Sequence, residues 1–149
     1  MRKLAAGNWK MNGKRASLSE VEAINAALDD KDPMVVICPP ASLLISACDI
    51  RGQVGIGAQD CHAAFSGAHT GDISASQIAD TGATYVIVGH SERRKDHSET
   101  NDVVKAKAQA AHEAGLIAII CIGETLVERE AGETLGVLGQ QMSESIPSG

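Results

Sequence analysis

This sequence has few aromatic residues, no long apolar run and no excess of positive charge. Among 149 residues only Trp9, Phe65 and Tyr85 are aromatic, so a core must be built from Val, Ile, Leu and Ala. The longest apolar run, Leu116 to Ile122, has seven residues, whereas a membrane-spanning helix needs about 20. Thirteen basic and 19 acidic residues give a formal charge of −6. This balance argues against a nucleic-acid-binding surface and against a polybasic membrane anchor.

Cysteine pairing and targeting signals are also lacking. The four cysteines have no CxxC spacing and lie mostly in apolar surroundings, which is typical of reduced thiols in a cytosolic protein. The N-terminus is basic, but no apolar segment of a signal peptide follows it. We therefore expect a cytoplasmic protein. The length fits one domain over residues 1–149, without a linker or a low-complexity tract.

Five short apolar runs alternate with helical patterns. The runs begin about 30, 20, 31 and 31 residues apart and are Leu4–Trp9, Met34–Cys38, Val54–Gln59, Tyr85–Val88 and Leu116–Ile122. Such runs without polar alternation predict strands that are buried on both faces, as in a parallel sheet. Helices are predicted over residues 17–28, 41–48, 74–81, 101–114 and 125–145, the first with Ser19 and Glu22 as a capping box and the last with a break near Gly132 and Gly136.

This alternation predicts an α/β fold, but it does not by itself separate an open doubly wound sheet from part of a barrel. In both architectures ligands bind at the carboxyl ends of the strands. The first strand ends in Asn8-Trp-Lys10, and strand geometry would direct Asn8 and Lys10 to the same side. A lysine and an amide emerging together could bind an anion. An exposed lysine beside a turn asparagine is the simpler interpretation of this tripeptide taken alone.

The fourth strand is followed by His90 and then by Ser91-Glu92, which is typical of a helix start. A helix N-terminus disfavours the imidazolium, and a neutral imidazole can donate a hydrogen bond to a carbonyl. A solvated turn histidine is the alternative. The third strand is followed by a glycine-punctuated loop with Thr70 near its tip. No HxH or HExxH spacing occurs among the histidines, so we expect no metal site and no cofactor.

Taken together, the strand ends resemble triosephosphate isomerase. The matching segments follow the family's order and are Gly7-Asn-Trp-Lys-Met-Asn12, Cys38-Pro-Pro40, Gly57-Ala-Gln-Asp60, Thr70-Gly-Asp-Ile-Ser74, Val88-Gly-His-Ser-Glu-Arg-Arg94 and Cys121-Ile-Gly-Glu124. The resemblance implies an incomplete (β/α)₈ TIM barrel of about five parallel units, from an enzyme that interconverts dihydroxyacetone phosphate and glyceraldehyde 3-phosphate without a cofactor. It implies substrate binding by Asn8 and Lys10, and catalytic roles for Lys10, His90 and Glu92.

The family's barrel has eight strands and about 250 residues. Its catalytic glutamate, carried on a lid segment after the sixth strand, has no counterpart in residues 1–149, nor have its two phosphate-binding glycine loops. General base catalysis contributes about 10²–10⁴-fold, so this chain alone is expected to have little isomerase activity. A non-catalytic oligomeric barrel fragment and a small-anion-binding protein are the alternatives. The resemblance places Thr70 at a dimer interface, and together with the exposed sheet edges it predicts a homo-oligomer.

Overall fold

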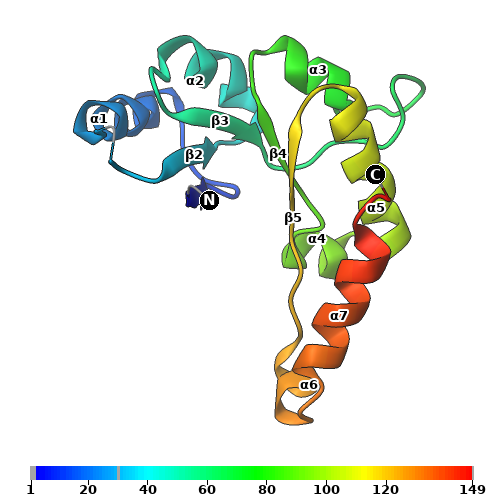
Figure 1. Ribbon diagram of the computed structural model, residues 1–149. Helices are drawn as coiled ribbons and strands as arrows, with labels where there is room; N and C mark the ends of the chain where they lie inside the picture. Colours follow the sequence, from blue (N-terminus) through cyan, green and yellow to red (C-terminus); the bar gives the residue numbers. More distant parts are fainter. Residues whose placement is uncertain (1–2, 30, 149) are drawn as a thin grey trace.

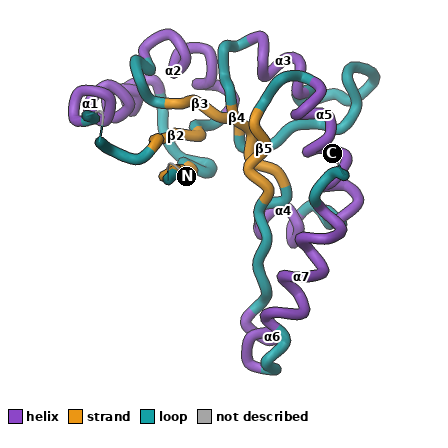
Figure 2. The backbone as a smooth tube through the Cα atoms, viewed as in Figure 1, coloured by secondary structure: helices purple, strands orange, loops and turns teal. Residues whose placement is uncertain are grey.

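The computed structural model describes residues 3–29 and 31–148, and it has the alternating order that the sequence predicts (Figures 1 and 2). The strands are β1 (Leu4–Asn8), β2 (Met34–Cys38), β3 (Gly55–Ala58), β4 (Tyr85–Val88) and β5 (Ile117–Ile120). The helices are α1 (Ser19–Ala27), α2 (Leu44–Ile50), α3 (Ala75–Asp80), α4 (Ser91–Asp96), α5 (Asn101–Glu113), α6 (Leu126–Glu130) and α7 (Thr134–Ser145), and short 3₁₀ helices η1 (Arg15–Leu18) and η2 (Ala41–Leu43) precede α1 and α2.

The five strands form one parallel sheet in the order β1-β2-β3-β4-β5. Figure 1 shows that the sheet curls and that helices cover its convex side. A doubly wound sheet would reverse its strand order at a switch point, whereas a β/α barrel adds strands in sequence. Among the described residues no strand pairs with the outer edge of β1 or of β5. The predicted incomplete barrel is therefore confirmed.

Two glycines of β3 make room for the side chains on the concave face of the sheet. A Cβ on Gly55 would lie 2.9 Å from the Tyr85 ring, and one on Gly57 would lie 2.8 Å from Cys38 Sγ. The concave face is lined by Val36, Cys38, Tyr85 and Ile87, with Ile119 and Cys121 packed beside them. These glycines thus let one large aromatic side chain fill the interior of a mostly aliphatic barrel.

The larger part of the core lies between the sheet and its helices. Its fully buried members include Val21, Ile56, Ile78, Val86, Val88 and Val104. The alternation of faces is clear in β4, where Val86 and Val88 face the helices while Tyr85 and Ile87 face the barrel interior. All four residues of β4 are buried. This burial on both faces explains why the strand reads as a continuous apolar run.

One sequence-based helix boundary is wrong, and a second is right at only one of its two glycines. Ser19 does not cap α1: it lies inside the helix, and its hydroxyl donates to Ala16 O (3.0 Å), because the chain enters through the 3₁₀ turn η1. The predicted break in 125–145 occurs at Gly132, which has φ 76°, but Gly136 lies within α7. A glycine breaks a helix when its backbone is left-handed, and its presence alone does not do so.

Arg94 joins four elements of the second half of the chain. Its guanidinium donates to Gly89 O (2.9 Å), Asn101 Oδ1 (2.6 Å), Cys121 O (3.2 Å) and Ser145 Oγ (3.1 Å). These acceptors follow β4, begin α5, follow β5 and end α7. These contacts tie the end of α7 to the start of α5, and Figure 1 shows the two helices side by side. No helix within residues 3–29 and 31–148 is long and apolar enough to span a membrane.

Candidate active site

Lys10 leaves the strand direction immediately after β1. Its φ is +53°, a left-handed value that is uncommon for residues other than glycine. Two hydrogen bonds hold this backbone: Lys10 N donates to Asn8 Oδ1 (2.8 Å), and Gln59 Nε2 donates to Lys10 O (2.8 Å). Gln59 Nε2 also donates to Cys38 O (2.9 Å), which ties the turn to the end of β2. Asn8 and Lys10 line the same cavity, as predicted. The prediction gave strand alternation as the reason that Lys10 lies on the same side as Asn8. In the structure the left-handed turn at Lys10 directs its side chain there.

His90 occupies the N-cap of α4, directly after β4. Its Nδ1 accepts a hydrogen bond from the backbone N–H of Glu92 (3.3 Å). The carboxylate of Glu92 is also near, with Oε2 3.5 Å from Nδ1. We favour the amide as the partner, because its nitrogen approaches Nδ1 more closely than the carboxylate does. A ring that accepts at Nδ1 carries its proton on Nε2, which is then free to donate to a ligand.

Lys10 and Glu92 form an ion pair that joins β1 to α4. Lys10 Nζ donates to Glu92 Oε1 at 2.6 Å, and the two side chains are about half exposed, 50% and 53%. The hydrogen bond from Lys10 lowers the pKa of Glu92 below its ordinary value. Lys10, Glu92 and His90 line one cavity of about 320 Å³ at the carboxyl edge of the sheet. The structure thus brings together the four residues Asn8, Lys10, His90 and Glu92.

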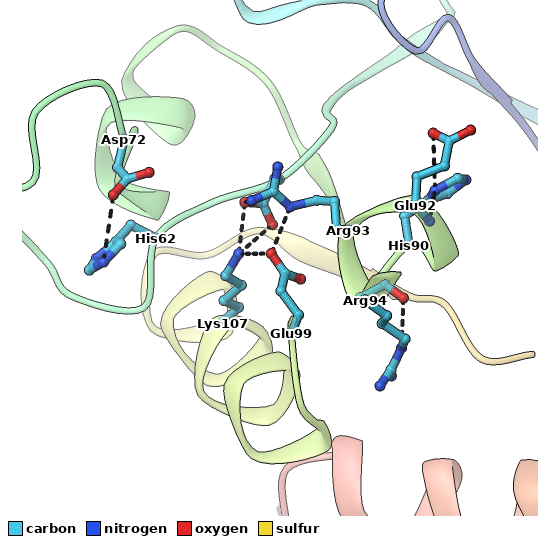
Figure 3. Close-up of polar contacts among 10 residues, drawn as sticks. His62, Asp72, His90, Glu92, Arg93, Arg94, Glu99 and Lys107 are labelled. Carbon is cyan, nitrogen blue, oxygen red and sulfur yellow. Dashed lines mark hydrogen bonds and ion pairs between the residues drawn. The ribbon is translucent and has the colours of Figure 1, made fainter. Parts of the chain in front are cut away.

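Four charged side chains, Asp60, Arg93, Glu99 and Lys107, form a cluster that is termed the charge cluster, and Asp60 and Arg93 also line the cavity. Figure 3 labels Arg93, Glu99 and Lys107 of this cluster. Lys107 Nζ, on α5, donates to Asp60 Oδ2 (2.7 Å) and Oδ1 (2.9 Å) and to Glu99 Oε1 (2.6 Å). Arg93 contacts the same two carboxylates, Asp60 Oδ2 at 2.9 Å and Glu99 Oε1 at 2.7 Å. Two positive and two negative groups therefore compensate one another, while Glu99 Oε2 has no hydrogen-bond partner among the described residues.

Burial and pairing act in opposite directions on the acids of the charge cluster. Burial raises the pKa of Asp60 above its ordinary value, and the nearby Lys107 and Arg93 only partly oppose it. Burial also acts to raise the pKa of Glu99, but the hydrogen bonds from Lys107 and Arg93 prevail and lower it. Because Arg93 follows Glu92 in α4, the cluster anchors the helix that carries His90 and Glu92.

Thr70 lies apart from these groups, exposed near the tip of the loop between β3 and α3. It does not line the cavity that contains Asn8 and Lys10. The contact that the resemblance implies is one with a second subunit, so the position of Thr70 within one chain neither supports nor contradicts it.

Gln59, Asp60, Glu99 and Lys107 were not predicted as site residues. Gln59 and Asp60 follow a predicted strand, a placement that signals a ligand-binding edge. Glu99 and Lys107 carry no comparable signal, because only the packing of α5 on the sheet brings them to Asp60.

Comparisons with known proteins cover nearly the whole chain. Residues 3–148 match the family model described as triosephosphate isomerase. Triosephosphate isomerase of Ruegeria sp. (strain TM1040) is 57% identical over 148 residues, which are 99% of this chain and 60% of that protein. The protein of the same name from Afipia carboxidovorans is 56% identical over 153 residues, covering 100% of this chain and 61% of its own length.

A solved structure agrees with these sequence relatives. The crystal structure of triosephosphate isomerase from Bartonella henselae superposes with a TM-score of 0.94 at 48% identity, over 100% of this chain and 62% of that one. The chain thus spans about 60% of the length of the curated relatives that it matches.

The sequential parallel sheet, with polar side chains gathered at its carboxyl edge, defines a protein of the TIM-barrel class. Within that class, the family model and the relatives together make the chain a member of the triosephosphate isomerase family.

Proposed function

We propose that this chain supplies the substrate-binding and electrophilic half of a site that interconverts dihydroxyacetone phosphate and glyceraldehyde 3-phosphate. The proposal rests on the ion pair between Lys10 Nζ and Glu92 Oε1, which lie 2.6 Å apart in the cavity that His90 also lines. Lys10 would bind the substrate anion and stabilise the oxyanion that develops during enolisation. Glu92 would fix the Lys10 ammonium, because its carboxylate accepts directly from Nζ.

His90 would donate from Nε2 to the substrate carbonyl. Its Nδ1 accepts from the Glu92 amide, which supports the neutral tautomer that this role requires. A neutral histidine paired with a glutamate base is the established arrangement of triosephosphate isomerases, and this family arrangement supports the role of His90. The glutamate base is expected outside residues 1–149, where the family places it on the sixth β/α unit.

Assembly and location follow from the same family membership. The exposed loop around Thr70 and the open edges of β1 and β5 support a homo-oligomer, because unpaired strand edges invite association. Four free cysteines support a reducing compartment, and we propose the cytoplasm.

Stand-alone anion binding is disfavoured by the charges around the cavity. Lys10 is already paired with Glu92, and Arg93 contacts both Asp60 and Glu99. Asp96 is a further acid in the cavity lining. An anion would therefore have to compete with carboxylates for both cations, which favours a site completed by further groups.

The test is an isomerase assay on two matched variants. The chain is mixed with a polypeptide that carries the remaining β/α units of the Ruegeria relative, and glyceraldehyde 3-phosphate turnover is measured. Lys10→Ala should reduce turnover at least 100-fold, the typical cost of losing an electrostatic donor at a developing oxyanion. Lys95→Ala, on the exposed side of α4, should leave turnover unchanged.

Equal turnover for Lys10→Ala and the wild type would contradict the proposal. A direct binding measurement on the complemented complex avoids dependence on turnover. Titration of 2-phosphoglycolate should shift the ring resonances of His90 in the wild type and in Lys95→Ala, but not in Lys10→Ala.

A further inference from the structure

We propose that Arg94 is a positioning residue for His90, the electrophile of the function proposed above, and this inference rests on that function. The Arg94 side chain leaves α4 on the side away from the Glu92 carboxylate (Figure 3), and it does not line the cavity that contains His90. Arg94 is therefore not placed to touch a substrate in that cavity. Its effect on the reaction has to pass through the backbone that carries His90.

Arg94 holds the two peptide groups on either side of His90. Its Nε donates to Gly89 O (2.9 Å), in the peptide that precedes His90. Its backbone N–H donates to His90 O (2.9 Å), in the peptide that follows. Gly89 has a left-handed φ of +68°, which turns the chain out of β4 just before the histidine. With both flanking peptides held, the imidazole can change its direction only by rotation about its own side-chain bonds.

The guanidinium that holds Gly89 is itself fixed by three other elements. Its Nη1 donates to Asn101 Oδ1 (2.6 Å) at the start of α5. Its Nη2 donates to Cys121 O (3.2 Å), which follows β5, and to Ser145 Oγ (3.1 Å) at the end of α7. Ser145 is fully buried. A different Arg94 rotamer would break all of these contacts together, so the peptide before His90 is fixed relative to three neighbouring elements.

The acceptors of Arg94 require the shape of a guanidinium as well as its charge. They are two backbone carbonyls, one side-chain amide and one hydroxyl. The nearby carboxylate acts through that amide, because Asn101 Nδ2 donates to Glu144 Oε2 (2.7 Å). A planar fork of N–H groups reaches acceptors in several fixed directions, whereas the ammonium of lysine is a single point of charge. Lysine at position 94 would therefore keep the charge and lose the positioning.

The first measurement uses the chain alone, so it does not depend on turnover. ¹⁵N NMR of the His90 ring at pH 8 reports which ring nitrogen carries the proton, and hydrogen exchange follows the Glu92 amide that donates to Nδ1. Arg94→Lys is compared with the wild type. Arg51→Lys is the matched control, because Arg51 also donates to a backbone carbonyl, Gly82 O (2.8 Å), but it precedes β3 at the opposite edge of the sheet.

The wild type and Arg51→Lys should have His90 protonated at Nε2 and a protected Glu92 amide. In Arg94→Lys the ring should be a mixture of both tautomers, and the Glu92 amide should exchange at least tenfold faster. Arg94 also supports the fold, so circular dichroism checks each variant. Ser145→Ala removes only one contact of the guanidinium and decides the question if Arg94→Lys does not fold. It should change the tautomer and the exchange rate in the same direction by a smaller amount.

The second measurement is turnover of glyceraldehyde 3-phosphate by the complemented complex, per assembled complex as measured by sedimentation. Arg94→Lys should lower kcat at least tenfold and change KM by less than about threefold, because the carbonyl donor is displaced while Lys10 still binds the anion. Absence of turnover in the wild type would contradict the proposed function and leave the NMR comparison to decide on Arg94. A wild-type tautomer and exchange rate in folded Arg94→Lys, or an unchanged kcat in an active complex, would overturn the positioning role.

Discussion

Replacing Lys107 by methionine removes one charge from the charge cluster while keeping the length of the side chain. Lys107 and Glu99 are nearly buried, with side chains 8% and 4% exposed. The change leaves Asp60 and Glu99 to share Arg93, so one partly buried and one buried negative charge face one positive charge. Removing one partner of a buried ion pair typically costs 3–5 kcal/mol. We expect about 3 kcal/mol here, since each carboxylate keeps one cationic neighbour.

Urea unfolding measures this loss, followed by circular dichroism and by the fluorescence of the single tryptophan, Trp9. For a chain of this length, about 3 kcal/mol corresponds to a fall in melting temperature of roughly 6–12 °C. Lys105→Met is the matched control, because Lys105 lies on the same helix and forms no ion pair with any described residue. It should change the free energy of unfolding by less than about 0.5 kcal/mol.

The double variant Lys107→Met/Glu99→Gln tests whether the loss of stability comes from unbalanced charge. It restores the balance of one acid and one base, so its loss of stability should be smaller than the sum of the two single losses. Equal stability for Lys107→Met and Lys105→Met, or strictly additive losses in the double variant, would show that the cluster's charges are not coupled as the structure implies.

Three further predictions concern thiols, glycines and acid stability. Burial raises the pKa of Cys38 to about 12, so at pH 8 only about 10⁻⁴ of this thiol is ionised. Iodoacetamide should therefore label Cys38 far more slowly than the half-buried Cys48, and mass spectrometry measures the two rates. Gly89→Ala should destabilise the fold more than Gly132→Ala. Both glycines have positive φ, but a Cβ on Gly89 would lie 2.7 Å from Val104, whereas a Cβ on Gly132 would meet no described atom within 4 Å. Equal melting temperatures of the two variants would contradict this prediction. The pKa of Glu99 is lowered on folding, so its contribution to stability is present at neutral pH and is lost as the pH falls below its ordinary value of 4.5. The stability of Glu99→Gln should therefore depend less on pH in that range, and parallel unfolding curves for the two proteins would refute the assignment.

The apolar runs of the sequence were sufficient for the existence of the five strands, whereas their sequential order was implied only by the resemblance to a known family. The runs are most distinct where a strand is buried on both faces. β4 is the clearest case, with all four residues buried. The meeting of Asn8, Lys10, His90 and Glu92 at one edge of the sheet could also be predicted, because they lie at or just after the ends of β1 and β4. Their roles in binding and catalysis stay predictions. Residues at the carboxyl ends of parallel strands converge whatever the details of packing.

Groups that meet through loop or helix geometry were not predictable in this way. His62, His69 and Asp72 approach one another because the loop closes on itself, and no spacing rule encodes that closure. Lys107 reaches Asp60 only once α5 has packed on the sheet. The left-handed turn at Lys10 was missed for a related reason: its φ is fixed by the amide of Gln59, 49 positions further along the chain.

The strand order carries a consequence for biosynthesis. Within residues 3–29 and 31–148, each strand of the sheet hydrogen-bonds only to the strands immediately before and after it in the chain. Pairing among these five strands therefore needs no partner from a distant part of the chain, and we expect the units to join the sheet one after another as the ribosome releases them. At about 5–20 residues per second, a unit of some 30 residues becomes available roughly every 2–6 s. Each newly folded strand then presents its open edge as the template on which the next one docks, and the growing barrel guides its own assembly from the N-terminus.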